Sequence, residues 1–292
     1  MRFTYAEAMT DPAYYVPLAQ AAETAGYDTM TVADSLCYPR ESDSVYPYTA
    51  DGGREFLEDK PFIEPFVQMS AMAAVTTRLR FTPFVLKLPM RPPLLVAKQA
   101  TSLAALSGNR LGLGVGSSPW REDYDACQIP WQQRGKRMNE AIDIIRGLMG
   151  GEYFEYHGEV FDLPAIKLCP APTRPVPILV GGHSDAALRR AAQRGDGWMH
   201  AGGDAEELDV LLDRLAELRR AEGTAEHPFE IHVISMDAYT PDGVRRLEDK
   251  GVTDVIVGFR SPYHQGPDTE PLEAKIAHLE RFAESVIAKT RA

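Results

Sequence analysis

The strongest chemical signal in the sequence is a run of small residues, Gly116-Ser117-Ser118, that directly follows an apolar segment. Glycine lets a backbone approach a ligand closely, and consecutive amides with serine hydroxyls form a nest suited to an anion such as phosphate. The run is not a dinucleotide fingerprint, because the sixth position counted from Gly112 or Gly114 is not glycine. A tight turn packed with small residues is the alternative interpretation.

A second glycine-rich segment, Gly181-Gly182, ends a later apolar run. His183 follows it, and Ser184 is placed to cap the next helix. Helix–strand packing could explain the glycine pair alone. Two glycine-rich segments on neighbouring strands, however, favour a ligand site.

Three ionisable residues also stand where apolar runs end. Asp34 closes one run and could accept a hydrogen bond from a ring N–H of a cofactor or substrate, or satisfy amides of its own loop. His200 and Arg260 could reach a substrate and are the candidate catalytic residues, with a solvated rim position as the alternative for each. The remaining histidines show no HExxH or paired spacing with carboxylates, so we expect no metal site.

The elements that would position these residues form a repeating pattern of strand and helix. Eight apolar or β-branched runs predict strands at Arg2–Ala6, Thr29–Asp34, Leu79–Leu86, Arg110–Val115, Val176–Val180, Gly197–His200, Phe229–Met236 and Asp254–Phe259. Most lack polar alternation, which indicates burial on both faces. Eight strand–helix units in 292 residues predict an α/β fold, a single (β/α)₈ TIM barrel spanning residues 1–292. The carboxyl ends of its strands would bring the three segments together.

Two stretches are longer than ordinary connections: residues 36–63 after the second strand and 150–175 before the fifth. Long insertions of this kind lie over barrel mouths, so the first is a candidate lid. Its aromatic residues could line an apolar pocket or pin the lid down; they are Tyr46, Tyr48, Phe56, Phe62 and Phe66.

Composition excludes several classes of function. A formal net charge of -11 argues against nucleic-acid binding, which needs a clustered basic surface. Three cysteines without a CxxC pair fit a reducing cytoplasm better than a disulfide framework. We find no signal peptide and no apolar stretch long enough for a membrane span, so we expect no membrane association.

Residues 79–150 resemble the bacterial luciferase-like monooxygenase superfamily, particularly its branch that uses coenzyme F420, a deazaflavin. The resemblance continues through EYHGEVFDL and PILVGGHSDAALRRAAQRGDGW. It implies a TIM barrel with an insertion near strand four, a small-molecule substrate, and a homodimer, since dimers are common in that group.

The resemblance also implies roles for single residues. In similar enzymes the aspartate that closes strand two contacts the deazaflavin ring, which assigns that role to Asp34. Phe84-Val85 resembles the place where relatives carry a non-proline cis peptide behind the ring. Lys87, two residues further along the chain, is expected to bind the cofactor as well. Ser117-Ser118 and Gly181-Gly182-His183-Ser184 resemble the segments that hold the phosphate arm, together with Gly116.

Two departures from the family pattern narrow the reaction. The sugar-phosphate dehydrogenases of the group carry a histidine and a glutamate where this chain has Ser35 and Pro119. Without that pair, sugar-phosphate oxidation is not expected, and the resemblance favours hydride transfer between F420 and another small organic substrate. An FMN-dependent monooxygenase working with a separate flavin reductase, and a cofactor-binding barrel without turnover, are the alternatives.

Overall fold

The computed structural model describes residues 1–47, 49 and 51–291. Nine parallel strand segments form one sheet in the order β3-β2-β1-β11-β10-β9-β8-β5-β4. Their bounds are β1 Arg2–Ala6, β2 Thr29–Val32, β3 Arg80–Pro83, β4 Leu86–Lys87, β5 Leu113–Gly116, β8 Ile178–Gly181, β9 Gly197–Met199, β10 Glu230–Val233 and β11 Asp254–Val257.

β3 and β4 are two pieces of the third barrel strand, separated by Phe84 and Val85. β3 also bridges Leu111, just before β5, through Phe81, and β4 pairs with β5 itself. The sheet therefore closes on itself, and the predicted TIM barrel of eight strand positions is confirmed.

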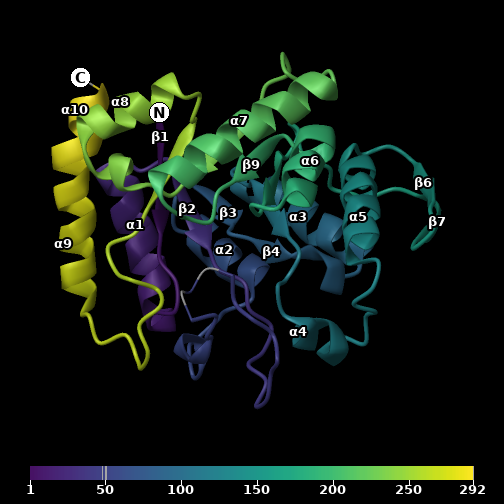
Figure 1. The fold of residues 1–292 in the computed structure, drawn as a ribbon, viewed down its shortest axis with the longest axis horizontal. Helices are drawn as coiled ribbons and strands as arrows, with labels where there is room; N and C mark the ends of the chain where they lie inside the picture. Colours follow the sequence, from purple (N-terminus) through teal and green to yellow (C-terminus); the bar gives the residue numbers. More distant parts are fainter. Residues whose placement is uncertain (48, 50, 292) are drawn as a thin grey trace.

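Helices cover the outside of this barrel (Figure 1). They are α1 Tyr15–Ala25, α2 Pro65–Ala73, α3 Pro93–Ser107, α4 Arg121–Ala126, α5 Arg134–Met149, α6 Asp185–Arg194, α7 Ala205–Ala221, α8 Pro241–Asp249, α9 Leu272–Phe282 and α10 Ala288–Arg291. Short 3-10 helices are η1 Pro12–Tyr14, η2 Glu55–Leu57, η3 Leu88–Met90 and η4 Met236–Tyr239, and η5 Ala283–Ile287 is a π-helical segment between α9 and α10. None of the described helices combines the length and apolar character needed to cross a membrane.

The structure corrects several predicted boundaries. The second strand ends at Val32 rather than Asp34, and the third is interrupted at Phe84 instead of running to Leu86. The stretch 150–175, expected as a long connection, contains an antiparallel hairpin, β6 Phe154–His157 with β7 Asp162–Ile166. This hairpin projects beyond α5 at one edge of the molecule (Figure 1).

The apolar core has two parts. The large part lies between the sheet and the helices, where residues such as Phe3, Leu113 and Trp198 are fully buried. The small part comprises Leu179, Met199 and Ile256, with Ala6, Phe84, Val85 and Ile234 packed against it. Because these residues alternate along the strands with those of the large core, they face the barrel axis.

Candidate active site at the carboxyl ends of the strands

The side chain of Val85 explains why Gly116 and Gly181 are glycines at the carboxyl ends of their strands, the mouth of the barrel. A Cβ on Gly116 would lie 2.5 Å from Val85 Cγ2, and one on Gly181 would lie 2.8 Å from Val85 Cγ1. Real Cβ atoms do not approach so closely, so both glycines make room for a neighbouring side chain of the same barrel. Neighbouring strands thus hold the interruption of the third strand in place.

The Phe84–Val85 peptide bond is cis although its second residue is not proline, as the resemblance implied. The amide of Phe84 donates to Val32 O at 2.7 Å, which keeps this segment tied to β2. Phe84 and Val85 are only partly buried, as are Ala6 and Ile234, and all four rest on the inner core. Together they form an apolar floor at the carboxyl end of the barrel.

Asp34 is buried and fully engaged by the protein. Its carboxylate forms a bidentate ion pair with Arg91, with N–O distances of 2.8 and 2.9 Å, and accepts a hydrogen bond from the Lys87 amide at 2.8 Å. Its side chain is 1% exposed. Asp34 therefore fixes the backbone just after the Phe84–Val85 segment. Arg91, which the sequence reasoning missed, carries no motif that could have revealed it.

The ammonium of Lys87 is likewise held inside the protein. It pairs with Asp123 at 2.7 Å, and the Ser118 hydroxyl donates to the same carboxylate oxygen at 2.6 Å. All three residues are buried. Of the predicted serine pair, Ser118 thus joins β5 to α4, whereas Ser117 is exposed and available to a ligand.

His183 and His200 stack on each other, with ring centroids 4.6 Å apart and an angle of 7° between the ring planes. His183 Nε2 accepts from the Ala201 amide, and its Nδ1 faces Glu207 at 3.2 Å. Trp198 Nε1 donates to Gly182 O at 2.9 Å, and Ser184 caps α6. The predicted segment 181–184 is thereby packed against the end of β9.

His200 is a fully buried, neutral imidazole. Its Nδ1 lies 3.1 Å from Ile234 O, an acceptor, so we assign the proton to Nδ1. Burial and the neighbouring His183 lower the pKa of His200 to about 4. Its Nε2 is buried without a hydrogen-bond partner among the described residues. His200 therefore offers a lone pair, and not a proton, near neutral pH.

Arg260 belongs to a network of ionic groups beside the mouth. It donates to Ala8 O and lies 3.4 Å from carboxylate oxygens of both Glu7 and Asp268. Lys275 pairs with the same two acids, at 3.3 and 2.8 Å. These bonds join β1 to the loop after β11 and to α9, and they leave Arg260 little freedom to reach a substrate.

The insertion after β2 covers this end of the barrel and is held there by aromatic contacts. Tyr46 stacks on Trp120 at 5.2 Å, and Phe56 meets Tyr263 edge-on at 5.2 Å. Three loops, after β2, β5 and β11, meet in this cluster. Phe66 instead belongs to the main core, Phe62 is only partly buried, and Tyr48 lies outside the described residues.

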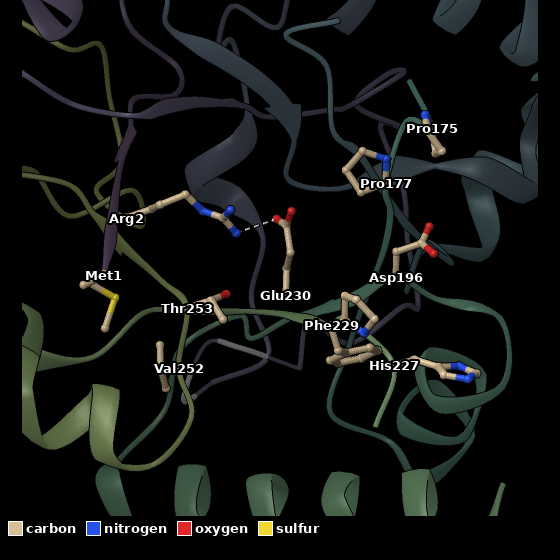
Figure 2. Close-up of a pocket in the computed structure, with 11 residues that line it drawn as sticks. Met1, Arg2, Pro175, Pro177, Asp196, His227, Phe229, Glu230, Val252 and Thr253 are labelled. Carbon is tan, nitrogen blue, oxygen red and sulfur yellow. Dashed lines mark ion pairs between the residues drawn. The ribbon is translucent and has the colours of Figure 1, made fainter. Parts of the chain in front are cut away.

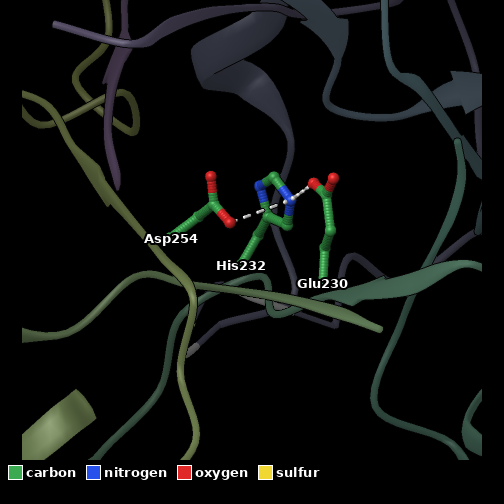
Figure 3. A group of neighbouring side chains, drawn as sticks. All are labelled: Glu230, His232 and Asp254. Carbon is green, nitrogen blue, oxygen red and sulfur yellow. Dashed lines mark hydrogen bonds and ion pairs between the residues drawn. The ribbon is translucent and has the colours of Figure 1, made fainter. Parts of the chain in front are cut away.

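The opposite, amino end of the barrel holds a group of metal-ligand types that sequence spacing did not reveal. His232 lies between Glu230 and Asp254, with Nε2 2.8 and 3.5 Å from their carboxylates (Figure 3). Arg2 already pairs with both acids, at 2.9 and 2.6 Å. Glu230, His232 and Asp254 therefore belong to an ion-pair network with Arg2, whose guanidinium already supplies a cation to the two carboxylates.

This network borders an open cavity of about 880 Å³ at the amino ends of the strands. Arg2 and Glu230 point toward each other on one wall, with Asp196 and His227 across from them (Figure 2). Active sites of TIM barrels lie at the carboxyl ends, so size alone does not make this cavity the site.

Comparison with known proteins finds one matching family and relatives that cover most or all of the chain. Residues 2–249 match the family described as luciferase-like monooxygenase. The uncharacterized protein Rv0940c of Mycobacterium tuberculosis is 68% identical over 289 residues, which cover 99% of this chain and 100% of that protein. The F420-dependent glucose-6-phosphate dehydrogenase of Beutenbergia cavernae is 30% identical over 233 residues, 78% of this chain and 64% of that enzyme.

A solved structure confirms the fold. The F420-dependent secondary alcohol dehydrogenase in complex with an F420-acetone adduct superimposes with a TM-score of 0.76 at 17% sequence identity. The alignment covers 100% of this chain and 99% of that one.

Proposed function

Since the chain belongs to the luciferase-like monooxygenase family, we propose that it is an oxidoreductase that transfers a hydride between coenzyme F420 and a small organic substrate. The observation that carries this proposal is the apolar floor at the carboxyl ends of the strands, formed by Ala6, Phe84, Val85 and Ile234. A partly exposed, rigidly backed apolar surface suits the face of a planar ring.

The residues around this floor fit a deazaflavin. Ser117 follows Gly116, and the segment Gly182-His183 follows Gly181, the two glycines that pack against Val85 of the floor. These residues would hold the phosphate arm, while Asp34 and Lys87 would fix the floor from behind. The bound deazaflavin would supply the hydride carrier. The protein would then contribute position and the exclusion of water.

We assign no proton donor among the described residues at the mouth of the barrel, which favours a reaction that needs only hydride transfer. Ser35 and Pro119 replace the proton-transfer pair of the sugar-phosphate dehydrogenases, and His200 is neutral near pH 7. We therefore propose a substrate other than a sugar phosphate, such as an activated alkene or imine. Glucose 6-phosphate should not be oxidised by the purified protein with F420.

A second candidate is an FMN-dependent monooxygenase that works with a separate flavin reductase, because the matched family carries the description of a monooxygenase. Titration of the purified protein with F420 and with FMN, each followed by quenching of ligand fluorescence, separates the two. Saturable binding of F420 and not FMN supports the first proposal. Binding of FMN alone would replace it with the second. Binding of neither ligand would contradict both and would favour the third alternative, a barrel without turnover.

The role of Asp34 can be tested by comparing two variants. We propose that Asp34 acts on the ring through the backbone it positions, because Arg91 and the Lys87 amide occupy its oxygens. Asp34→Ala and Arg91→Met should then weaken F420 binding to a similar extent. Weak binding in Asp34→Ala alone, with normal affinity in Arg91→Met, would mean that the carboxylate contacts the ring directly.

We further propose that the protein works in the cytoplasm as one barrel domain per chain, paired in a homodimer. The support is the family resemblance and the three cysteines, which are free. Sedimentation of the purified protein at micromolar concentration gives the oligomeric state, and a monomer there would contradict the dimer.

A further inference from the structure

Three half-buried arginines of α5 and α6 have no acidic partner. Arg134 begins α5, Arg137 lies one turn further along it, and Arg190 lies on α6. Their side chains donate to neutral acceptors, namely Trp131 O, Pro89 O, Asn139 Oδ1 and Gly135 O. Within the part of the chain that the structure describes, no carboxylate forms an ion pair with any of the three. Such unpaired guanidiniums are unexpected in a protein whose formal net charge is -11.

The phenolic group of Tyr124, on α4, is the common neighbour of these arginines. Its ring meets Trp131 edge-on at 4.9 Å, and the guanidinium of Arg134 lies 3.8 Å from the centre of the Trp131 ring. The charges of Arg134, Arg137 and Arg190 all act on the phenol. Tyr124 is fully buried, yet its hydroxyl has no hydrogen-bond partner among the described residues. Buried polar groups in native proteins are nearly always hydrogen-bonded, so this hydroxyl points to a missing acceptor.

The hydroxyl of Tyr124 keeps its proton near neutral pH and can therefore donate it. Burial raises its pKa to about 12, although the three arginines act in the opposite direction. Asp123 is the neighbouring acid, but its carboxylate is already engaged by the Lys87 ammonium at 2.7 Å and by the Ser118 hydroxyl at 2.6 Å. The acceptor that Tyr124 lacks must then come from another molecule.

The amino end of α5 adds to the positive character of this place. The helix is 16 residues long, its N-cap Gln133 makes no side-chain capping bond, and its first turn holds no acidic residue. The free amides at a helix start carry a partial positive charge. α6 lies beside α5 (Figure 1), and Arg190 Nη2 donates to Gly135 O at 3.4 Å. A Cβ on Gly135 would lie 3.3 Å from that same nitrogen, so the glycine lets the guanidinium come close to the helix start.

We propose that Arg134, Arg190 and the hydroxyl of Tyr124 bind a phosphate group, with Arg137 adding positive charge. Guanidiniums bind phosphate oxygens in pairs, and a helix amino end favours an anion. A phosphate dianion has enough charge and enough acceptor oxygens for two arginines and a phenol. The place lies close to the mouth of the barrel, because Arg137 donates to Pro89 O in η3, which directly follows β4.

The phosphate has two possible sources, which share this chemistry: the arm of the proposed cofactor and a separate phosphorylated compound. Inorganic phosphate is the probe, titrated into the protein by isothermal calorimetry at an ionic strength held constant with chloride. Acetate, a singly charged anion, is titrated in the same way. The phosphate titration is then repeated with F420 present. Competition between the two would identify the cofactor arm as the source, and independent binding a separate compound.

We expect saturable binding of phosphate and much weaker binding of acetate. Arg134→Gln and Arg190→Gln should each weaken phosphate binding by about tenfold, the loss that one charge-assisted contact implies. Tyr124→Phe should weaken it by a smaller factor, because a neutral donor is lost. Arg189→Gln is the matched control: it removes the same charge from the neighbouring residue of α6, which is exposed and pairs with Asp185 at 2.9 Å. This variant should keep the affinity.

Equal affinity for acetate and phosphate would overturn the proposal, as would the absence of saturable phosphate binding. An equal loss in Arg189→Gln would also overturn it, because net charge alone would then explain the effect. Thermal unfolding identifies a glutamine variant that fails to fold. In that case Arg134→Lys, which keeps the charge but not the fork, and Tyr124→Phe decide, and unchanged affinity in both contradicts the site. Failure of F420 to bind would affect the proposed function alone, because the phosphate titration does not need the cofactor.

Discussion

His200 links the mouth of the barrel to the pH dependence of stability. The pKa of its imidazole falls from 6.5 to about 4 on folding, so between these values the unfolded chain binds a proton that the folded chain does not. Stability from this residue is therefore present above pH 6.5 and declines as pH falls toward 4. In His200→Asn, which keeps a donor for Ile234 O, chemical denaturation should show a shallower loss of stability over this range. Parallel curves for the two proteins below pH 6.5 would refute the assignment.

Gly116 is the position where a single methyl group should disturb the site. Gly116→Ala places a Cβ against Val85 Cγ2, and overpacking of this kind costs about 1–3 kcal/mol. Thermal unfolding should show the loss, and F420 affinity should fall because the Phe84–Val85 segment is displaced. Gly135→Ala is the control, since its Cβ would meet only the flexible end of Arg190. Equal stability of the two variants would contradict the close packing around Val85.

The sequence located the residues of the mouth but not their partners. Asp34 and Ser118 lie near the ends of predicted strands, which periodicity and glycine patterns could predict, whereas Lys87 was included only through the family resemblance. Arg91 and Asp123 sit in segments that look like ordinary helix starts, and only the tertiary arrangement brings them to Asp34 and Lys87. Side-chain pairing between distant elements has no signature in local spacing, so these contacts could not be predicted.

At the scale of elements, a carboxylate of α5 attaches the turn of the β6–β7 hairpin to that helix. Glu140 accepts hydrogen bonds from the amides of Glu159, Val160 and Phe161, each at 3.0 Å, and so binds the turn to the helix. Glu140→Gln should weaken this attachment by about 1–3 kcal/mol, because charged acceptors make the stronger hydrogen bonds.

Hydrogen exchange measures this loss directly. The three turn amides should exchange faster in Glu140→Gln, with F420 binding unchanged, and Glu155→Gln on exposed β6 should have no effect. Unaltered exchange would show that the turn does not rely on Glu140. The hairpin itself was missed from the sequence because its strands are short, β6 contains Glu155 and His157 among its four residues, and β7 contains a proline, features that are typical of a loop.

At the scale of the whole molecule, the barrel closes between its first and last strands, and ionic groups at the amino end hold that closure. Arg2 pairs with Asp254, which is fully buried, and with Glu230. Arg2→Met leaves a buried carboxylate without its cation, which costs about 3–5 kcal/mol. Urea denaturation should show this loss, while F420 affinity is kept because the mouth lies at the other end.

Arg80→Met is the matched control, because Arg80 is 3.7 Å from Glu230 and is not bonded to Asp254. Arg2→Met with Asp254→Asn should recover part of the stability, since the uncompensated charge is removed. A stable Arg2→Met protein would show that closure rests on the strand hydrogen bonds instead. The count of eight strands could be predicted from the sequence. The ion pair between Arg2 and Asp254 could not, because these residues become neighbours only when β1 pairs with β11 in the closed barrel.

The acidic surface around the barrel has a consequence for the kinetics of binding. The molecule carries a formal net charge of -11, so an anion that comes within a Debye length of the surface, about 8 Å at physiological salt, is repelled. Added salt screens this repulsion and should speed the encounter, whereas buried ion pairs such as Lys87 with Asp123, which support the mouth, are screened much less and should keep their geometry. Moderate ionic strength would then tighten the complex of this acidic protein with an anion.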